Sequence, residues 1–130
     1  MAYPYLTIDL DKIEYNTRRI VTLCQSHGIE VAGVTKATCG DPGVARAMLR
    51  GGVTAIADSR LENIQRLIKG GVDSQFMMLR LPSLSRADEI VEYADISLNS
   101  ELAVLAALSE VARNCGKLHD VILMVDLGDL

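Results

Sequence analysis

Tryptophan is absent from this 130-residue sequence, and aromatic residues make up only 4% of it. The single phenylalanine is Phe76. A folded core must therefore rest on aliphatic and methionine side chains. Long apolar runs are missing as well, because Lys or Asp interrupts every cluster of Val, Ile, Leu and Met before the roughly 20 residues that a membrane helix needs. We therefore predict a protein without membrane spans.

Positive charge is not in excess either. The 13 Lys and Arg against 17 Asp and Glu give a net charge of −4, and the basic residues are scattered, which argues against a nucleic-acid partner. The three cysteines, Cys24, Cys39 and Cys115, form no CxxC pair and predict neither a disulfide framework nor a metal site. Because the first ten residues carry no basic patch and no long apolar stretch, no secretory signal is expected, and we predict a cytoplasmic protein.

What the chain does have is the composition of a folded protein, with 49% hydrophobic and 23% charged residues and no linker to divide it. We predict one domain over residues 1–130. Short apolar runs without polar alternation are typical of strands covered on both faces, as in a parallel sheet. They lie at residues 31–35, 53–57, 76–81, 95–98 and 121–127, after an extended segment at 5–10.

Helices are expected between these strands, because capping residues and glycines mark their ends. The predicted caps are Asp11 with Glu14, Asp41 before Pro42, Ser59 with Glu62, Ser85 with Asp88, and Asn99 with Ser100. The predicted C-terminal glycines are Gly28, Gly51, Gly52, Gly70, Gly71 and Gly116. In the last helix, a buried stripe is expected at Leu102, Leu105, Ala106 and Ala112.

The midpoints of the five strands are separated by 22, 23, 19 and 26 residues, which is a βα repeat and predicts parallel strands. Two architectures hold such a repeat, a doubly wound sheet and a (β/α)₈ barrel of the TIM type. A doubly wound sheet normally ends in a helix, whereas this chain stops at Leu130, just after a strand. We therefore favour an incomplete barrel with about five of the eight strands, the remainder and a C-terminal domain being expected outside this chain.

Lys36 follows directly on the apolar strand at 31–35. Ligands bind at this end of the strands in both architectures. A lysine near an apolar barrel interior is less well hydrated, so its neutral amine can attack an aldehyde. The alternative is a lysine that extends from the strand end into solvent.

Other residues at the predicted strand ends are weaker candidates. Arg80 is expected to be at least half-buried and to need an acidic or phosphate partner, and Asp126 is expected to lie beneath the site. Cys39 is interpreted as a small buried residue. His27 and His119 are interpreted as structural, with His119 at the opposite end of the strands from the site.

Several segments together resemble the alanine racemase family of pyridoxal-phosphate barrel enzymes. They are residues 5–11, Lys36, residues 56–59 and residues 123–129, and the resemblance covers essentially the whole chain. Within the family, residues 33–36, 39–42, 57–60, 79–82 and 124–130 are most similar to the ornithine racemase group.

The resemblance implies a Schiff base between Lys36 and pyridoxal 5'-phosphate, and proton transfer at the Cα of a small amino-acid substrate. It also implies a homodimer in the full-length protein, whose partner subunit supplies a tyrosine on the opposite face of the substrate. On this basis Lys36 is the predicted catalytic residue, and Lys36, Arg80, Asn99 and Asp126 are the predicted cofactor-binding residues. There are two departures from the family. The loop at 37–41 lacks the family's phosphate-binding tyrosine, so that phosphate contact is absent. Residues 126–129 replace its Asp-Thr-Gly-Met segment, which argues against alanine as the substrate.

Two alternatives stay open at this point. A non-catalytic pyridoxal-phosphate carrier would use the same lysine without proton transfer. A doubly wound receiver or binding domain would need an acidic cluster at the strand ends, for which only Asp58 and Asp126 are available.

Overall fold

The strands form one parallel sheet whose spatial order follows the chain, β1-β2-β3-β4-β5. The computed structural model describes residues 4–128. Its strands are β1 (Ala32–Val34), β2 (Ala55–Asp58), β3 (Gln75–Met78), β4 (Ile96–Asn99) and β5 (Asp120–Leu123). A doubly wound sheet reverses its strand order at a switch point. This sheet does not reverse, so the incomplete barrel is confirmed and the doubly wound alternative is wrong.

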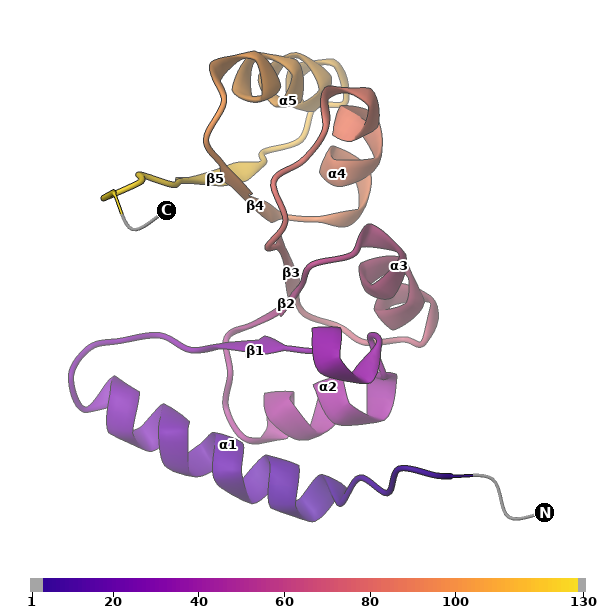
Figure 1. Cartoon of the computed structure of the whole chain (residues 1–130), viewed down its shortest axis with the longest axis vertical. Helices are drawn as coiled ribbons and strands as arrows, with labels where there is room; N and C mark the ends of the chain where they lie inside the picture. The colour runs from indigo at the N-terminus through magenta and orange to yellow at the C-terminus, as the bar shows by residue number, and fades with distance from the viewer. Residues whose placement is uncertain (1–3, 129–130) are drawn as a thin grey trace.

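The helices before and between the strands cover one side of the sheet (Figure 1). They are α1 (Leu10–Gln25), α2 (Pro42–Arg50), α3 (Leu61–Lys69), α4 (Ala87–Tyr93) and α5 (Leu102–Asn114), with 3₁₀ turns η1 (Lys36–Thr38) and η2 (Leu84–Arg86). Figure 1 shows α2, α3, α4 and α5 following the curve of the strands, while no described helix covers the other face of the sheet. This arrangement is the arc of a barrel wall, with the helices outside.

The core lies between this arc and its helices. Ile56 from β2 packs with Ile64 and Leu67 from α3, and all three are fully buried. Gly33 in β1 allows α2 to approach closely, because a Cβ at this position would lie 2.8 Å from the Sδ atom of Met48. The aliphatic core expected from the shortage of aromatic residues is therefore present.

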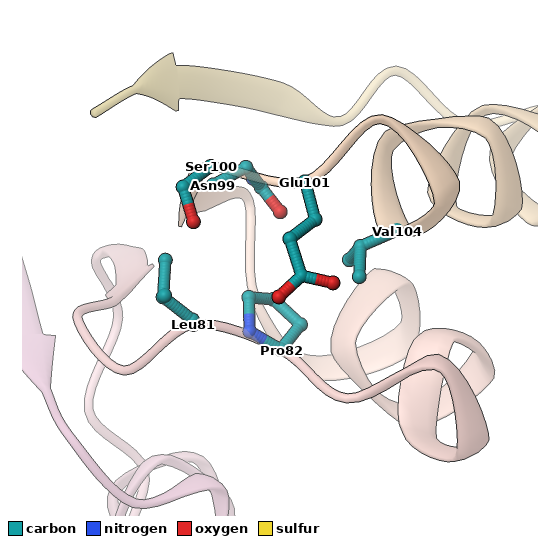
Figure 2. A pocket seen from close by; sticks show the side chains of 6 residues that line it. All are labelled: Leu81, Pro82, Asn99, Ser100, Glu101 and Val104. Atoms are coloured by element: carbon teal, nitrogen blue, oxygen red, sulfur yellow. The ribbon is translucent and has the colours of Figure 1, made fainter. Parts of the chain in front are cut away.

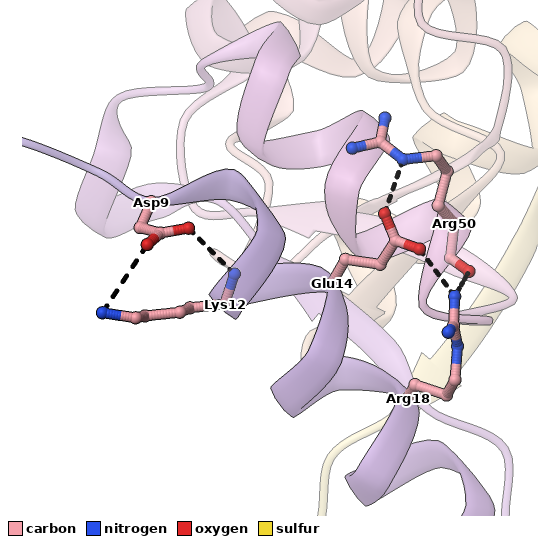
Figure 3. Close-up of polar contacts among 5 residues, drawn as sticks. All are labelled: Asp9, Lys12, Glu14, Arg18 and Arg50. Atoms are coloured by element: carbon pink, nitrogen blue, oxygen red, sulfur yellow. Dashed lines mark hydrogen bonds and ion pairs between the residues drawn. The ribbon is translucent and has the colours of Figure 1, made fainter.

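Helix α1 packs on α2 through an ion cluster at its surface (Figure 3). Glu14 accepts hydrogen bonds from Arg50 at 2.7 Å and from Arg18 at 2.6 Å. The bond from Arg50 is the largest cause of the lowered pKa of Glu14. The two helices also meet closely at Gly51, where a Cβ would lie 2.5 Å from the Cβ of Thr17.

One prediction at the N-terminal end is wrong. Residues 5–9 precede the first helix without joining the sheet, and α1 begins at Leu10 with Asp9 as its cap, whose carboxylate accepts from Lys12 N at 3.1 Å. The predicted cap, Asp11, lies inside the helix. Asp9 precedes Asp11 by two residues and offers the same chemistry, so the spacing to Glu14 selected the wrong aspartate.

Among the other caps, only Asp41 is confirmed. Its carboxylate accepts from Val44 N at 3.0 Å, with Pro42 at the start of α2. Helices α3, α4 and α5 begin after Arg60, Arg86 and Glu101, none of which makes a side-chain capping bond. The caps predicted at Ser59, Ser85, Asn99 and Ser100 are therefore wrong. The predicted C-terminal glycines do adopt positive φ at Gly28, Gly52, Gly71 and Gly116.

The buried stripe of α5 is also different from the prediction. It consists of Val104, Leu108 and Ala112, whereas Leu102 is 82% exposed. Both stripes follow helical spacing, and contact with α4 and η2 decided between them. Within residues 4–128, no helix is both long enough and apolar enough to cross a membrane.

Candidate active site at the ends of the strands

Lys36 lies at the C-terminal end of β1, where it begins η1. Its side chain is exposed, and no hydrogen bond or ion pair between described residues involves its Nζ atom. The carboxyl ends of the neighbouring parallel strands lie at the same edge. A primary amine without a partner among residues 4–128 is thus presented where barrel enzymes bind their ligands.

The residue before Lys36 is held by a buried carboxylate. Thr35 and Asp58 are both 0% exposed, and Thr35 Oγ1 donates to Asp58 Oδ2 at 2.8 Å. The backbone N–H of Thr35 also donates to the carbonyl of Ala57 at 3.0 Å. These two bonds tie the start of the Lys36 turn to β2.

Asp58 is itself fully engaged. Its Oδ1 accepts from Arg60 N at 3.0 Å and from Asn63 Nδ2 at 2.9 Å, and its carbonyl accepts from Leu79 N at 2.9 Å. A buried carboxylate needs such donors. A supporting role for Asp58 was not predicted, although two polar residues, Thr35 and Asp58, at the ends of neighbouring apolar strands were a usable signal.

The loop after Lys36 turns sharply. Cys39 has a φ of 52° and Gly40 a φ of 66°, both in the left-handed region. The Cys39 side chain is exposed, so the predicted buried residue is wrong. Its carbonyl accepts from Arg66 Nη1 at 3.2 Å. A left-handed turn at this point leads the chain directly from the lysine into α2.

Arg80 and Asp126 are both exposed, contrary to the expectation that they are partly covered. No ion pair of residues 4–128 involves Arg80, which follows β3 at the same edge of the sheet as Lys36. Asp126 lies beyond β5, and its Oδ1 accepts from Gly128 N at 2.7 Å within a local turn. Asp129, the last residue of the predicted motif at 126–129, lies outside the described residues.

Asn99, at the end of β4, is buried with 1% exposure and belongs to a polar chain. Its Nδ2 donates to Ser97 O at 3.0 Å and to Ser97 Oγ at 2.9 Å. Ser97 Oγ lies 2.8 Å from His119 Nε2, and His119 Nδ1 lies 3.0 Å from the carbonyl of Ala94. Since a carbonyl only accepts, Nδ1 carries the proton and Ser97 donates to Nε2.

Burial lowers the pKa of His119, in keeping with a neutral ring that accepts from Ser97. This confirms the prediction that His119 is structural and away from the ligand-binding ends of the strands. Asn99 Oδ1, in contrast, has no partner in the described structure. An unpaired buried acceptor costs about 1–3 kcal/mol.

The sequence profile of the family "alanine racemase, N-terminal domain" matches residues 8–130. This chain belongs to that family. The chain is 38% identical over its whole length to a lysine racemase from Thermotoga maritima and covers 37% of that protein. It is 41% identical over 98% of its length to an ornithine racemase from Acetoanaerobium sticklandii and covers 36% of that protein. This chain thus spans little more than a third of the length of these two relatives.

Solved structures agree on the fold. An alanine racemase from E. faecalis superposes with a TM-score of 0.77 at 24% identity, covering 95% of this chain and 34% of the other. A D-threonine aldolase from Filomicrobium marinum superposes with a TM-score of 0.80 at 16% identity, covering 98% of this chain and 35% of the other. At these identities the likeness concerns the barrel arc alone.

The residues at the strand ends fit an aldehyde cofactor that carries a phosphate. Lys36 offers a primary amine with no protein partner, and Arg80 offers a guanidinium with no ion pair among the described residues. Asp58, which accepts from the Thr35 side chain directly before Lys36, is already satisfied by three donors. The described residues form no cluster suited to a metal ion.

Proposed function

We propose that this chain is the N-terminal part of a pyridoxal-phosphate-dependent amino-acid racemase. The observation that carries the proposal is Lys36, an unpaired amine at the end of the first barrel strand, anchored through Thr35 by a buried carboxylate. The similarity to lysine and ornithine racemases supports it. The cytoplasmic location and the homodimer stay predictions.

The proposed chemistry is proton transfer at the substrate Cα. The cofactor, when bound, withdraws electrons from that carbon and makes its proton easier to remove. Lys36 Nζ then takes or returns the proton on one face of the substrate. A residue from outside this chain, expected in the partner subunit, serves the opposite face.

The other residues have supporting parts in this proposal. Thr35 and Asp58 hold the turn that carries Lys36, so that its amine meets the cofactor from a fixed direction. Arg80 binds the phosphate or orders Lys36. Asp126 supports the cofactor site from the segment after β5, and Asn99 contributes to the same site from the end of β4. Asn99 has used both amide hydrogens, which disfavours a phosphate contact there.

A basic amino acid is the proposed substrate. The two relatives that cover the whole chain, or nearly so, are named a lysine racemase and an ornithine racemase, at 38% and 41% identity. Proteins named alanine racemase match at 28%, 30% and 32% identity. The missing phosphate-binding tyrosine and the altered segment at 126–129 agree with a substrate other than alanine.

Lys36→Ala in the full-length protein tests the proposal. Loss of the amine should abolish the visible absorption of bound cofactor and lower racemisation of ornithine by at least about 10³-fold, since nucleophile and base are lost together. Borohydride reduction followed by mass spectrometry should place the cofactor on Lys36 in the unaltered protein. Lys69→Ala, which removes an exposed lysine from α3, is the matched control.

Retained racemisation in Lys36→Ala would overturn the proposal. Deuterium exchange at the substrate Cα separates a racemase from a carrier, because a carrier would bind the cofactor through Lys36 without exchange.

A further inference from the structure

The turn that carries Lys36, residues 35–40, is attached to α3 at both of its ends. At its start, Thr35 Oγ1 donates to Asp58 Oδ2 at 2.8 Å, and the other oxygen of that carboxylate accepts from Asn63 Nδ2 of α3 at 2.9 Å. Asp58 therefore bridges the turn and the helix. Because Thr35 and Asp58 are both fully buried, water does not compete for the bond between them.

The end of the turn packs directly on the same residue of α3. Gly40 is buried, and a Cβ at this position would lie 2.8 Å from both the Cβ and the carbonyl oxygen of Asn63. A distance below 3.0 Å is too short for a real Cβ atom, so only glycine allows this contact. Three residues further along α3, Arg66 Nη1 donates to the carbonyl of Cys39 at 3.2 Å. Asn63 thus acts on both ends of the turn, and Arg66 adds a bond at its far end.

The backbone of the turn is strained at this far end. Cys39 has a φ of 52°, and it is the only non-glycine residue with a positive φ among the described residues. A residue with a side chain is disfavoured in the left-handed region. Such strain persists only where the surrounding structure holds it, and it gathers at functional sites. The contacts from α3 hold the strained backbone here.

The corresponding turn after β4 has no such attachment. Figure 2 shows Ser100 and Glu101 leading from β4 into α5. Glu101 makes no side-chain capping bond, and within residues 4–128 no side chain of a neighbouring helix forms a hydrogen bond with this turn. Both turns connect a strand to a helix at the same edge of the sheet. Attachment to a neighbouring helix is therefore not a general property of these turns.

We propose that α3 fixes the direction from which Lys36 meets its substrate, with Asn63 and Arg66 as positioning residues. The inference rests on the proposed function, in which Lys36 Nζ moves a proton at the substrate Cα. The backbone of the turn is held at both ends, whereas the Lys36 amine has no partner among residues 4–128. A fixed backbone below a free amine suits proton transfer, because even a small misplacement of a reacting group lowers the rate strongly.

Gly40→Ala in the full-length protein separates the contact with α3 from ordinary backbone strain. Gly40 has a φ of 66°, and Gly116, which follows α5, has a φ of 65°. Gly116→Ala is the matched control, because it places a methyl group on the same backbone conformation but with nothing within 4 Å. Hydrogen exchange of the cofactor-free protein, followed by mass spectrometry, reports on the amides of residues 38–40, which are bonded within the turn. Their exchange should be at least about tenfold faster in Gly40→Ala and unchanged in Gly116→Ala.

Asn63→Leu tests the polar half of the attachment and stays informative if Gly40→Ala does not fold. Leucine keeps the size of the side chain but cannot donate to Asp58. We expect at least about tenfold faster exchange at residues 38–40, and a kcat for ornithine at least about tenfold lower with a KM within about twofold, since the substrate contacts stay intact. Gln65→Leu is the control on the same helix, because no side-chain hydrogen bond within the described chain involves Gln65, and it should alter neither quantity.

Arg66 supplies a test of the far end of the turn. Arg66→Ala should also speed exchange at residues 38–40, and Arg66→Lys, which keeps a cationic donor, should recover part of the loss. Faster exchange that is confined to the turn, together with the loss of kcat in Asn63→Leu, supports the positioning role. Unchanged exchange, an unchanged kcat, or exchange that rises equally throughout β3 and β4 would overturn it, because a merely structural residue loosens the whole sheet.

A failure of the proposed function gives a different result. If the unaltered protein racemises no amino acid, the proposed function is wrong, and the affinity for pyridoxal phosphate, measured by visible absorption, takes the place of kcat. The dissociation constant should then rise at least about tenfold in Asn63→Leu and stay unchanged in Gln65→Leu. Equal dissociation constants in the two variants, or no binding at all, would overturn the positioning role as well.

Discussion

Strands β2 and β5 have similar sequences and opposite environments. Each has four residues, and three in each are apolar. All four residues of β2 are buried, whereas all four of β5 are exposed, with Val121 at 47% and Leu123 at 62%. The two strands therefore differ in their neighbours far more than in their composition.

The neighbours explain the difference. Strand β2 pairs with both β1 and β3 and is covered by α2 and α3. Strand β5 pairs only with β4 among the described residues, so its second edge is unpaired there. Unpaired strand edges beside apolar side chains attract further strands. An apolar run thus specifies a strand, but the completeness of the sheet determines how much that strand contributes to stability.

Ile56→Ala in β2 should have the largest effect on stability. The side chain is fully buried, so its loss should lower the free energy of unfolding by about 2–5 kcal/mol. Ile122→Ala in β5, where the side chain is 45% exposed, should lower it by less than about 0.5 kcal/mol. Urea denaturation of the 130-residue chain measures both changes. Equal losses would show that β5 is covered in solution, and sedimentation would then reveal association between copies.

Thr35→Val, directly after β1, should have an intermediate effect on the free energy of unfolding. The substitution keeps the shape of the side chain but leaves Asp58 Oδ2 without its donor in a buried position, which should cost about 1–3 kcal/mol. Thr35→Ser, which keeps the hydroxyl, should recover most of the loss. Thr54→Val is the control, because Thr54 is exposed. A Thr35→Val variant as stable as the original chain would contradict a structural role for the Thr35–Asp58 bond.

Substitution of His119 should have the smallest effect on stability, and this effect should depend on pH. Burial holds its pKa below its usual value of 6.5, so the unfolded chain binds the proton more readily than the folded chain. The contribution of His119 is therefore complete above pH 6.5 and falls as the pH drops from there toward the lower pKa of the folded state. A plot of the urea midpoint against pH between pH 5 and 8 should have a shallower slope for His119→Gln than for the unaltered chain. His27→Gln, at an exposed position, should leave the slope unchanged.

Some residues of the candidate site could be predicted from the sequence and others could not, and the reasons are physical. Lys36 was identifiable because an apolar strand that ends in a lysine combines two local features. The exposure of Arg80 could not be predicted, because the strand at 76–81 was expected to continue to Leu81, whereas it ends at Met78. Asp58 was identified within a motif, yet its bond to Thr35 joins residues on different strands and depends on their register.

The sequence by itself determined the βα repeat, the aliphatic core and the position of Lys36, because strand length, helix spacing and glycine at helix ends are local properties of the chain. The tertiary structure alone decided the order of the strands, which stripe of α5 is buried, and the pairing of Thr35 with Asp58. It also buried Asn99 Oδ1 without a hydrogen-bond donor among the described residues. Such contacts join residues distant in the chain, and local patterns carry no information about them.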